Sequence, residues 1–213
     1  MAQAASFADA AAAAIPGGAD VLINNAGIYA AERTLSTDGI ELNFAVNVLA
    51  TVLLTRRFVR SGGLKKGGRI VNVSSMMHAQ ASGVYALDNL QLEKTGYDPH
   101  TAYSLSKLCL TMWSIELAAE LRGVADVISC HPGVVQTKML TKGFGNFGSD
   151  VNAAHHELLL ATAPELKGVT GKYFMPDAQE SRTAPPTNSA HARSALMEKV
   201  DAMIAPFDTE CTS

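Results

Sequence analysis

Short apolar runs alternate along this chain with longer segments of helical periodicity. Three of these runs, residues 20–24, 69–74 and 124–130, are rich in valine and isoleucine and are followed by asparagine, serine or His-Pro-Gly. A strand that is apolar at nearly every position, and not only at alternate positions, is typical of a parallel sheet with helices on both faces. The chain is therefore predicted to have an α/β fold.

The segments between and after these strands have the composition and spacing of helices. An alanine-rich amphipathic helix over residues 1–15 is expected to end at Pro16, because proline and glycine stop helices. We see no internal repeat and no second domain, so residues 1–213 are predicted to form one domain with about four strands. The remaining expected elements are helices at 38–60, at 101–122, from Ser149 or Asp150 to about 163 and at 194–204, a short strand at 171–175 and a frayed tail at 206–213.

Composition limits the classes of function. With 213 residues, 47% of them hydrophobic, the chain suits a globular domain with a buried core. The net charge of −3 and the lack of a long basic run argue against nucleic-acid or anionic-membrane binding. The sequence has no signal-like positive N-terminus and no apolar stretch of about 18 residues, so no membrane span is expected. Cys109, Cys130 and Cys211 fit no metal spacing and indicate reduced thiols, with a cytoplasmic location.

The strongest chemical signal is the pair Tyr103 and Lys107, in the stretch Tyr-Ser-Leu-Ser-Lys. Residues four apart lie on one face of a helix, so the hydroxyl and the ammonium point in the same direction. A free tyrosine has a pKa near about 10 and exchanges protons poorly at neutral pH. A nearby cation favours the phenolate and would lower that pKa, which general acid–base catalysis requires. On its own, this spacing is more often a solvated pair of residues four apart on a helix, with no catalytic role.

Other polar features stand in an order that supports the pair. Asn24-Asn25-Ala26-Gly27 follows the first strand, Ser74-Ser75 follows the second, and Pro132-Gly133 follows the third. Parallel strands end at the same edge of a sheet, which is where open α/β sheets bind ligands. Asn47 lies on an otherwise apolar helix face, where a buried amide needs a hydrogen-bond partner.

This succession resembles the short-chain dehydrogenase/reductase family over about residues 20–175. The stretches that carry the resemblance are Asn-Asn-Ala-Gly (24–27), Asn47, Ile-Val-Asn-Val-Ser-Ser (70–75), Tyr-Ser-Leu-Ser-Lys (103–107) and His-Pro-Gly-Val-Val-Gln-Thr (131–137). The resemblance implies a Rossmann-like, doubly wound parallel sheet. It also implies oxidoreduction of an alcohol or carbonyl compound by hydride transfer with a nicotinamide cofactor, NADP or NAD.

The resemblance implies a role for each matched residue. Tyr103 would be the general acid–base, and Ser75, rather than Ser74, would hold the substrate oxygen. Lys107 would bind the nicotinamide ribose and lower the pKa of Tyr103, and Asn47 would hold a water molecule that relays protons. The other residues expected to contact the cofactor are Asn25, Ala26, Gly27, Pro132, Gly133, Val135 and Thr137.

The insertion between Ser75 and Tyr103 is similar to that of the subgroup containing retinol dehydrogenases and WW-domain-containing oxidoreductases. That subgroup implies a lipophilic alcohol, aldehyde or ketone as the substrate, and it favours NADP over NAD. Met76 and Met77 are candidates for contact with an apolar substrate, although simple packing is the commoner role of methionine. His155-His156-Glu157 lacks the histidine spacing of a zinc site and is expected on a solvated helix face, and His78 and His131 are expected to cap or line loops.

The resemblance also implies a segment that these 213 residues do not contain. Members of the family have a glycine-rich turn before a helix, and no Thr-Gly-x-x-x-Gly-x-Gly occurs here. That turn offers backbone donors and a helix N-terminus to the pyrophosphate. Losing about three such bonds, at roughly 1.5–3 kcal/mol each, would remove most of the ~8 kcal/mol of a micromolar complex. Cofactor binding by this chain is therefore expected to be negligible.

The same gap would leave one strand without a neighbour. In the strand order of the family, residues 21–24 would lie beside the absent first strand, and an open apolar edge favours self-pairing. Two alternatives to an active oxidoreductase therefore stay open. Either the chain is a catalytically impaired remnant that binds a partner or forms a homo-oligomer, or the natural protein has an upstream segment.

Overall fold

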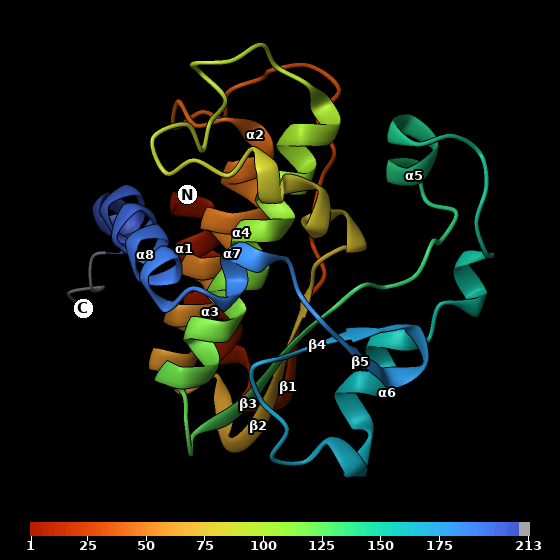
Figure 1. Cartoon of the computed structure of the whole chain (residues 1–213). Coiled ribbons are helices and arrows are strands. Elements are labelled where there is room, and N and C mark those ends of the chain that lie inside the picture. Colours follow the sequence, from red (N-terminus) through yellow and green to blue (C-terminus); the bar gives the residue numbers. More distant parts are fainter. Residues whose placement is uncertain (209–213) are drawn as a thin grey trace.

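The computed structural model describes residues 1–208, which form a five-stranded sheet with helices on both faces (Figure 1). The first four strands are parallel, and β5 runs antiparallel to β4. The α/β class is confirmed, whereas the prediction of about four strands missed β5, whose three exposed residues carry no apolar signal. The strands, in spatial order, are β1 (Ala19–Asn24), β2 (Leu64–Val73), β3 (Ala125–Cys130), β4 (Lys172–Met175) and β5 (Gln179–Ser181).

The helices are unevenly distributed over the two faces. Helices α1, α3, α4 and α8 cover one face, and α6 lies on the other (Figure 1). The α-helices are α1 (Ala2–Ala14), α2 (Leu42–Phe44), α3 (Thr51–Arg60), α4 (Pro99–Glu120), α5 (Lys138–Gly143), α6 (His156–Thr162), α7 (Pro185–Asn188) and α8 (Ala190–Ile204). Short helical turns are η1 (Ala45–Ala50), η2 (Met76–Gly83), η3 (Val151–Ala153), η4 (Pro164–Leu166), η5 (Pro176–Ala178) and η6 (Ala205–Phe207).

Successive residues of β2 show why its sequence is apolar without alternation. Ile70 is fully buried in the cluster that contains Trp113, on the face covered by α4. Val71 is fully buried in the opposite cluster, which contains Leu160 of α6. Both faces of the strand therefore contribute to a core, as the apolar run predicted.

The helix expected at 38–60 begins later and has an irregular turn. The Glu41 carboxylate accepts hydrogen bonds from the backbone N–H groups of Asn43 (3.0 Å) and Phe44 (2.8 Å), so the helix starts at Leu42. Residues 45–50 then form a π-helical turn before α3. Turns of this kind inside α-helices often occur at functional sites, and Asn47 lies in this one.

The helix expected from residue 149 or 150 to 163 is divided in two. Asp150 accepts a hydrogen bond from the N–H of Asn152 at 2.8 Å, but the turn that it caps ends at Ala153. A separate helix, α6, then begins at His156. The expectation was right about the capping residue and wrong about the length of the helix that follows it.

The stretch Leu42–Arg60 is long and apolar enough to cross a membrane, with a mean hydropathy of 1.3. The fold buries 61% of its most apolar window. Buried core helices of soluble proteins often have the same length and hydropathy, so this stretch is weak evidence for a membrane span. The expected absence of a membrane span therefore stays a prediction.

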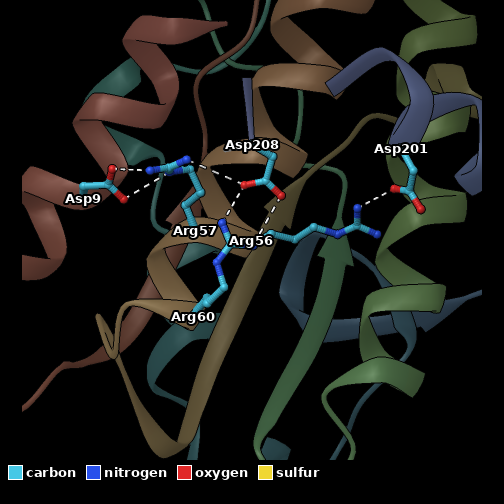
Figure 2. Close-up of polar contacts among 6 residues, drawn as sticks. All are labelled: Asp9, Arg56, Arg57, Arg60, Asp201 and Asp208. Atoms are coloured by element: carbon cyan, nitrogen blue, oxygen red, sulfur yellow. Dashed lines mark hydrogen bonds and ion pairs between the residues drawn. The ribbon is translucent and has the colours of Figure 1, made fainter. Parts of the chain in front are cut away.

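Arginine side chains on α3 join the two ends of the described chain (Figure 2). Arg57 is buried; its Nε donates to Asp9 of α1 at 3.1 Å, and its Nη1 lies 3.8 Å from Asp208. Arg60 donates to the same Asp208 carboxylate at 2.6 Å, and Arg56 pairs with Asp201 of α8. Fraying was expected from residue 206, yet 206–208 are held in place; the rest of that tail lies outside the described residues.

This arrangement predicts that Arg57 contributes to stability. We expect Arg57→Met to lower the free energy of unfolding by about 2 kcal/mol, because it leaves a partly buried Asp9 carboxylate without its main partner. Lys65→Met is the matched control, since Lys65 and Asp20 form an exposed pair whose loss should cost under about 1 kcal/mol. Urea unfolding of both variants measures the difference, and equal effects would contradict the prediction.

Candidate active site

A cavity of about 630 Å³ lies at the carboxyl ends of β1, β2 and β3. Residues that follow all three strands line it, as the position of the polar motifs predicted. Of the expected site residues, Asn47 alone does not line the cavity. Those that do are Asn25, Ala26, Gly27, Ser75, Tyr103, Lys107, Pro132, Gly133, Val135 and Thr137.

The two serines after β2 have different surroundings. The Ser74 hydroxyl donates to the Lys107 carbonyl at 3.0 Å and shares a 2.8 Å hydrogen bond with the Thr111 hydroxyl, so it is occupied by α4. The Ser75 hydroxyl accepts a hydrogen bond from the N–H of Met77 at 3.2 Å and also interacts with the Tyr103 side chain. Ser75 is therefore the serine beside Tyr103, although its role in catalysis stays a prediction.

Tyr103 and Lys107 lie on one face of α4, as their spacing predicted. Asp98 caps this helix by accepting a hydrogen bond from the N–H of Thr101 at 2.7 Å. The Lys107 ammonium lies 5.7 Å from the centre of the Tyr103 ring and donates to the Val73 carbonyl at 2.8 Å. Full burial lowers the pKa of Lys107 to about 8, because the charged form is poorly solvated there.

The pKa of Tyr103 moves in the direction opposite to the one expected. Burial raises the pKa of Tyr103 above its usual value, and the hydrogen bond with Ser75 offsets only part of that effect. The Lys107 ammonium is directed to the Val73 carbonyl at 2.8 Å. The Tyr103 pKa therefore lies above its usual value and not below it as expected, and the neutral hydroxyl is favoured; the contribution of Lys107 to this pKa stays a prediction.

The Asn47 amide supports the loop after β1. Its Oδ1 accepts a hydrogen bond from the N–H of Ile28 at 2.8 Å, and its Nδ2 donates to the Ile28 carbonyl at 3.0 Å. Nδ2 also donates to the Ser106 hydroxyl on α4 at 2.9 Å. The partners expected for a buried amide are thus backbone and hydroxyl groups of the chain, and the proposed water relay stays a prediction.

Gly27 passes close to both Asn47 and Lys107. A Cβ atom at this position would lie 3.3 Å from the Asn47 Oδ1 and 3.4 Å from the Lys107 Nζ. The first distance is tighter than most real Cβ contacts, so a side chain would press on the Asn47 amide, and it would also contact the buried ammonium. Glycine therefore allows the loop to form one wall of the cavity beside Lys107.

Comparisons with known proteins agree with this geometry. A family model described as short chain dehydrogenase matches residues 1–87. Human retinol dehydrogenase 14 is 36% identical over 183 residues, covering 78% of this chain and 53% of that protein. Mouse polyprenol dehydrogenase is 31% identical, covering 75% of this chain and 52% of that protein. The chain spans about half the length of these curated relatives.

Solved structures give the same result for the fold. A protein from Mycobacterium paratuberculosis matches with a TM-score of 0.74 and 26% identity, covering 96% of this chain and 74% of that one. A blue fluorescent protein from a metagenomic library, in complex with NADPH, matches with a TM-score of 0.60 and 27% identity. The match covers 83% of this chain and 72% of that one. The chain belongs to the short-chain dehydrogenase/reductase family.

In this short-chain dehydrogenase/reductase, His78 and His131 lie beside loops that border the cavity, as expected. The His78 ring bridges two segments: its Nδ1 lies 2.7 Å from the Ser75 carbonyl, and its Nε2 accepts from the N–H of Ala184 at 3.2 Å. His78 therefore carries its proton on Nδ1 and supports the backbone of Ser75. His131 lines the cavity, and burial lowers its pKa to about 4.

The predicted solvated face at residues 155–157 is only partly correct. His155 is exposed, whereas His156 is buried, because α6 packs its first residue toward the sheet. Within residues 1–208, no group of three histidine, cysteine or acidic side chains is placed to hold a metal ion. Cys109 and Cys130 are free and buried, and Cys211 lies outside the described residues.

The sequence did not predict the apolar wall on the side of α5. Met139 and Leu140 of this helix line the cavity, together with Phe144 and Phe147 just after it. A signal was present, because Thr137 caps the helix by accepting from the N–H of Leu140 at 3.2 Å. Six residues between two glycine-containing loops are, however, too few for periodicity to reveal a helix.

The buried Lys107 predicts a specific dependence of stability on pH. Its pKa in the folded chain, about 8, lies below the usual 10.5, so the unfolded chain binds more protons between these pH values. The contribution of Lys107 to the free energy of unfolding therefore rises with pH in that interval. We expect the free energy of unfolding of the wild type to rise by up to ~3 kcal/mol relative to that of Lys107→Met across this interval.

Urea unfolding of both proteins at several pH values measures the difference in their free energies of unfolding. Lys167→Met, which removes an exposed lysine, is the matched control for loss of a positive charge. A difference between K107M and the wild type that stays constant between pH 8 and 10.5 would show that the ammonium is not buried as the structure places it.

Proposed function

We propose that this chain carries the catalytic half of an NAD(P)-dependent oxidoreductase that interconverts an alcohol and a carbonyl compound. The observation that carries the proposal is the meeting of Ser75, Tyr103 and Lys107 in one cavity. Ser75 follows β2, and Tyr103 and Lys107 lie on α4. The Ser75 and Tyr103 side chains interact, and the Lys107 ammonium lies 5.7 Å from the centre of the Tyr103 ring. The family supports this activity, because its named relatives are dehydrogenases.

The described residues fit the nicotinamide–ribose half of the cofactor. Gly27 leaves open the space beside the Lys107 ammonium, which a side chain would fill. Gly133 has a φ of +88°, a conformation that favours glycine, and it places the backbone of residues 132–137 along the opposite wall. Tyr103 and Lys107 would hold the ribose, and Pro132 to Thr137 would face the nicotinamide. The 213 residues include no glycine-rich loop for the pyrophosphate, so this fit concerns one half only.

The side chains of the cavity have complementary tasks in the proposed reaction. Ser75 donates a hydrogen bond to the substrate oxygen and keeps it beside the Tyr103 hydroxyl. Tyr103 donates a proton to that oxygen in reduction and removes it in oxidation. A nicotinamide held by these residues would supply or accept the hydride. Lys107, with a pKa of about 8, stays largely protonated at neutral pH and stabilises negative charge that develops on the tyrosine oxygen.

The lining of the cavity supports a lipophilic substrate. Its wall is largely apolar and includes Met76, Met77, Met139, Phe144 and Phe147. Flexible methionines suit long or irregular apolar molecules. Relatives named retinol dehydrogenase and polyprenol dehydrogenase are consistent with this substrate class. A match to a structure solved with NADPH supports NADP as the cofactor. A cytoplasmic location remains part of the proposal.

Substitution of Tyr103 tests the proposed chemistry. In the full-length protein, we expect Tyr103→Phe to lower kcat at least about 100-fold, because phenylalanine cannot transfer a proton. Binding of NADPH, followed by fluorescence titration, should change little. Tyr85→Phe is the control, since its hydroxyl bonds the Ala192 carbonyl at 3.3 Å outside the cavity. Turnover retained by Y103F would show that another group moves the proton.

A second candidate function, self-association, is favoured by the position of β1. This strand lies at the edge of the sheet formed by residues 1–208, and its Ile23 side chain is 39% exposed. An edge strand with an exposed apolar side chain can pair with a second copy of itself. In this alternative the 213-residue chain acts as a homo-oligomer without turnover.

A lysine on this strand tests the alternative. If β1 forms the interface, Ile23→Lys should convert dimers of the 213-residue chain to monomers in size-exclusion chromatography with light scattering. Val124→Lys, at another exposed apolar residue, should leave the oligomeric state unchanged. A wild-type chain that is monomeric at all concentrations would exclude self-association through this edge.

A further inference from the structure

Four aromatic rings from three segments meet beside the cavity. The ring centre of Phe144 lies 5.2 Å from that of Tyr29, 4.9 Å from that of His100 and 5.9 Å from that of Tyr103. Tyr29 also contacts His100 at 5.5 Å and Tyr103 at 5.9 Å. These separations and tilted geometries are those of favourable aromatic pairs. We call this set of four the aromatic cluster.

Phe144 lies in a segment of the chain, residues 137–148, that contains α5 and that we call the flap. Its two ends are held together, because the N–H of Gln136 donates to the Ser149 carbonyl at 2.8 Å and the N–H of Ser149 donates to the Val134 carbonyl at 2.9 Å. Between these ends, none of the six residues of α5 is buried. The two ends of the flap are therefore joined by hydrogen bonds, and between them its main contact with the rest of the chain is through Phe144.

Gly143 shows how closely the flap lies on Tyr29. A Cβ atom at Gly143 would lie 2.9–3.0 Å from the Tyr29 ring, a distance that requires one of the two to move. The φ angle of Gly143 is not in the left-handed region, so glycine is needed at this position for lack of space and not for its backbone conformation. The adjacent positions 143 and 144 thus both meet the same tyrosine ring.

We propose that Phe144 is a positioning residue that holds the flap over Tyr103 and so completes the apolar wall of the substrate cavity. Tyr29 and His100 form its docking site. The part of this proposal that concerns turnover rests on the proposed function, whereas the docking of the flap does not. Loss of the Phe144 ring would free residues 137–148 and leave Met139 and Leu140 without a fixed place beside the substrate.

Limited trypsin digestion tests the docking without any measurement of activity. Lys138 and Lys142 are exposed residues of the flap and provide the cleavage sites. We expect Phe144→Ala to increase the initial rate of cleavage roughly 10-fold, because several ring contacts are lost. Phe147→Ala is the matched control: Phe147 lies in the same flap, is 52% exposed and, within the described residues, is not part of the aromatic cluster. Equal cleavage of both variants would overturn the proposal.

Gly143→Ala separates docking from helix stability. Alanine is a much better helix former than glycine, so local helix stability alone would make α5 more resistant to trypsin. Docking predicts the reverse, since the new methyl group meets the Tyr29 ring. We expect G143A to be cleaved faster than the wild type, and to add nothing when Tyr29 is already alanine. Slower cleavage of G143A would overturn the proposal.

Kinetics of the full-length protein test the consequence for catalysis. Phe144→Ala should raise KM for long-chain alcohols about 10-fold while changing kcat less, and Phe144→Tyr should restore most of the affinity. A fall in kcat with KM unchanged would refute the assigned role in forming the substrate wall. If no variant or wild-type protein turns over, the proposed function fails, and the proteolysis still decides whether the flap docks through Phe144.

Discussion

The reciprocal hydrogen bonding between β2 and α4 is the interaction on which the rest of the site depends. The Lys107 ammonium donates to the Val73 carbonyl at 2.8 Å, and the Ser74 hydroxyl donates to the Lys107 carbonyl at 3.0 Å. These bonds fix the rotation of α4 against the end of the strand, and they thereby bring Tyr103 to Ser75. The same contact explains why a fully buried lysine is tolerated, since its ammonium keeps a carbonyl partner.

Three amide side chains extend this order across the sheet. Asn47 connects the loop after β1 to α4 through Ile28 and Ser106. Nearer the strands, the Asn24 amide donates to Asn72 at 2.7 Å, and Asn72 donates to Ser114 of α4 at 2.9 Å. Because these amides find their hydrogen-bond partners within the chain, they stabilise the surroundings of the cavity independently of any bound molecule.

Much of the fold could be predicted because its signals are local. Apolar runs revealed β1, β2 and β3, and the motif at residues 103–107 placed two functional groups on one helix face. Elements without such signals were missed: β5 is polar and α5 is too short for periodicity. The burial of His156 was also missed, because it depends on how α6 meets the sheet and not on neighbouring residues in the sequence.

The sequence by itself determined the fold class, the family and the cavity residues that follow the strands or lie on α4, since strand ends and helix spacing are properties of short stretches. Only the tertiary structure decided how those residues behave. It raised the pKa of Tyr103, which the sequence predicted would fall, because burial is set by elements distant along the chain. It also brought Phe144 onto Tyr29 and His100, a contact between segments whose separate sequences contain no sign of one another.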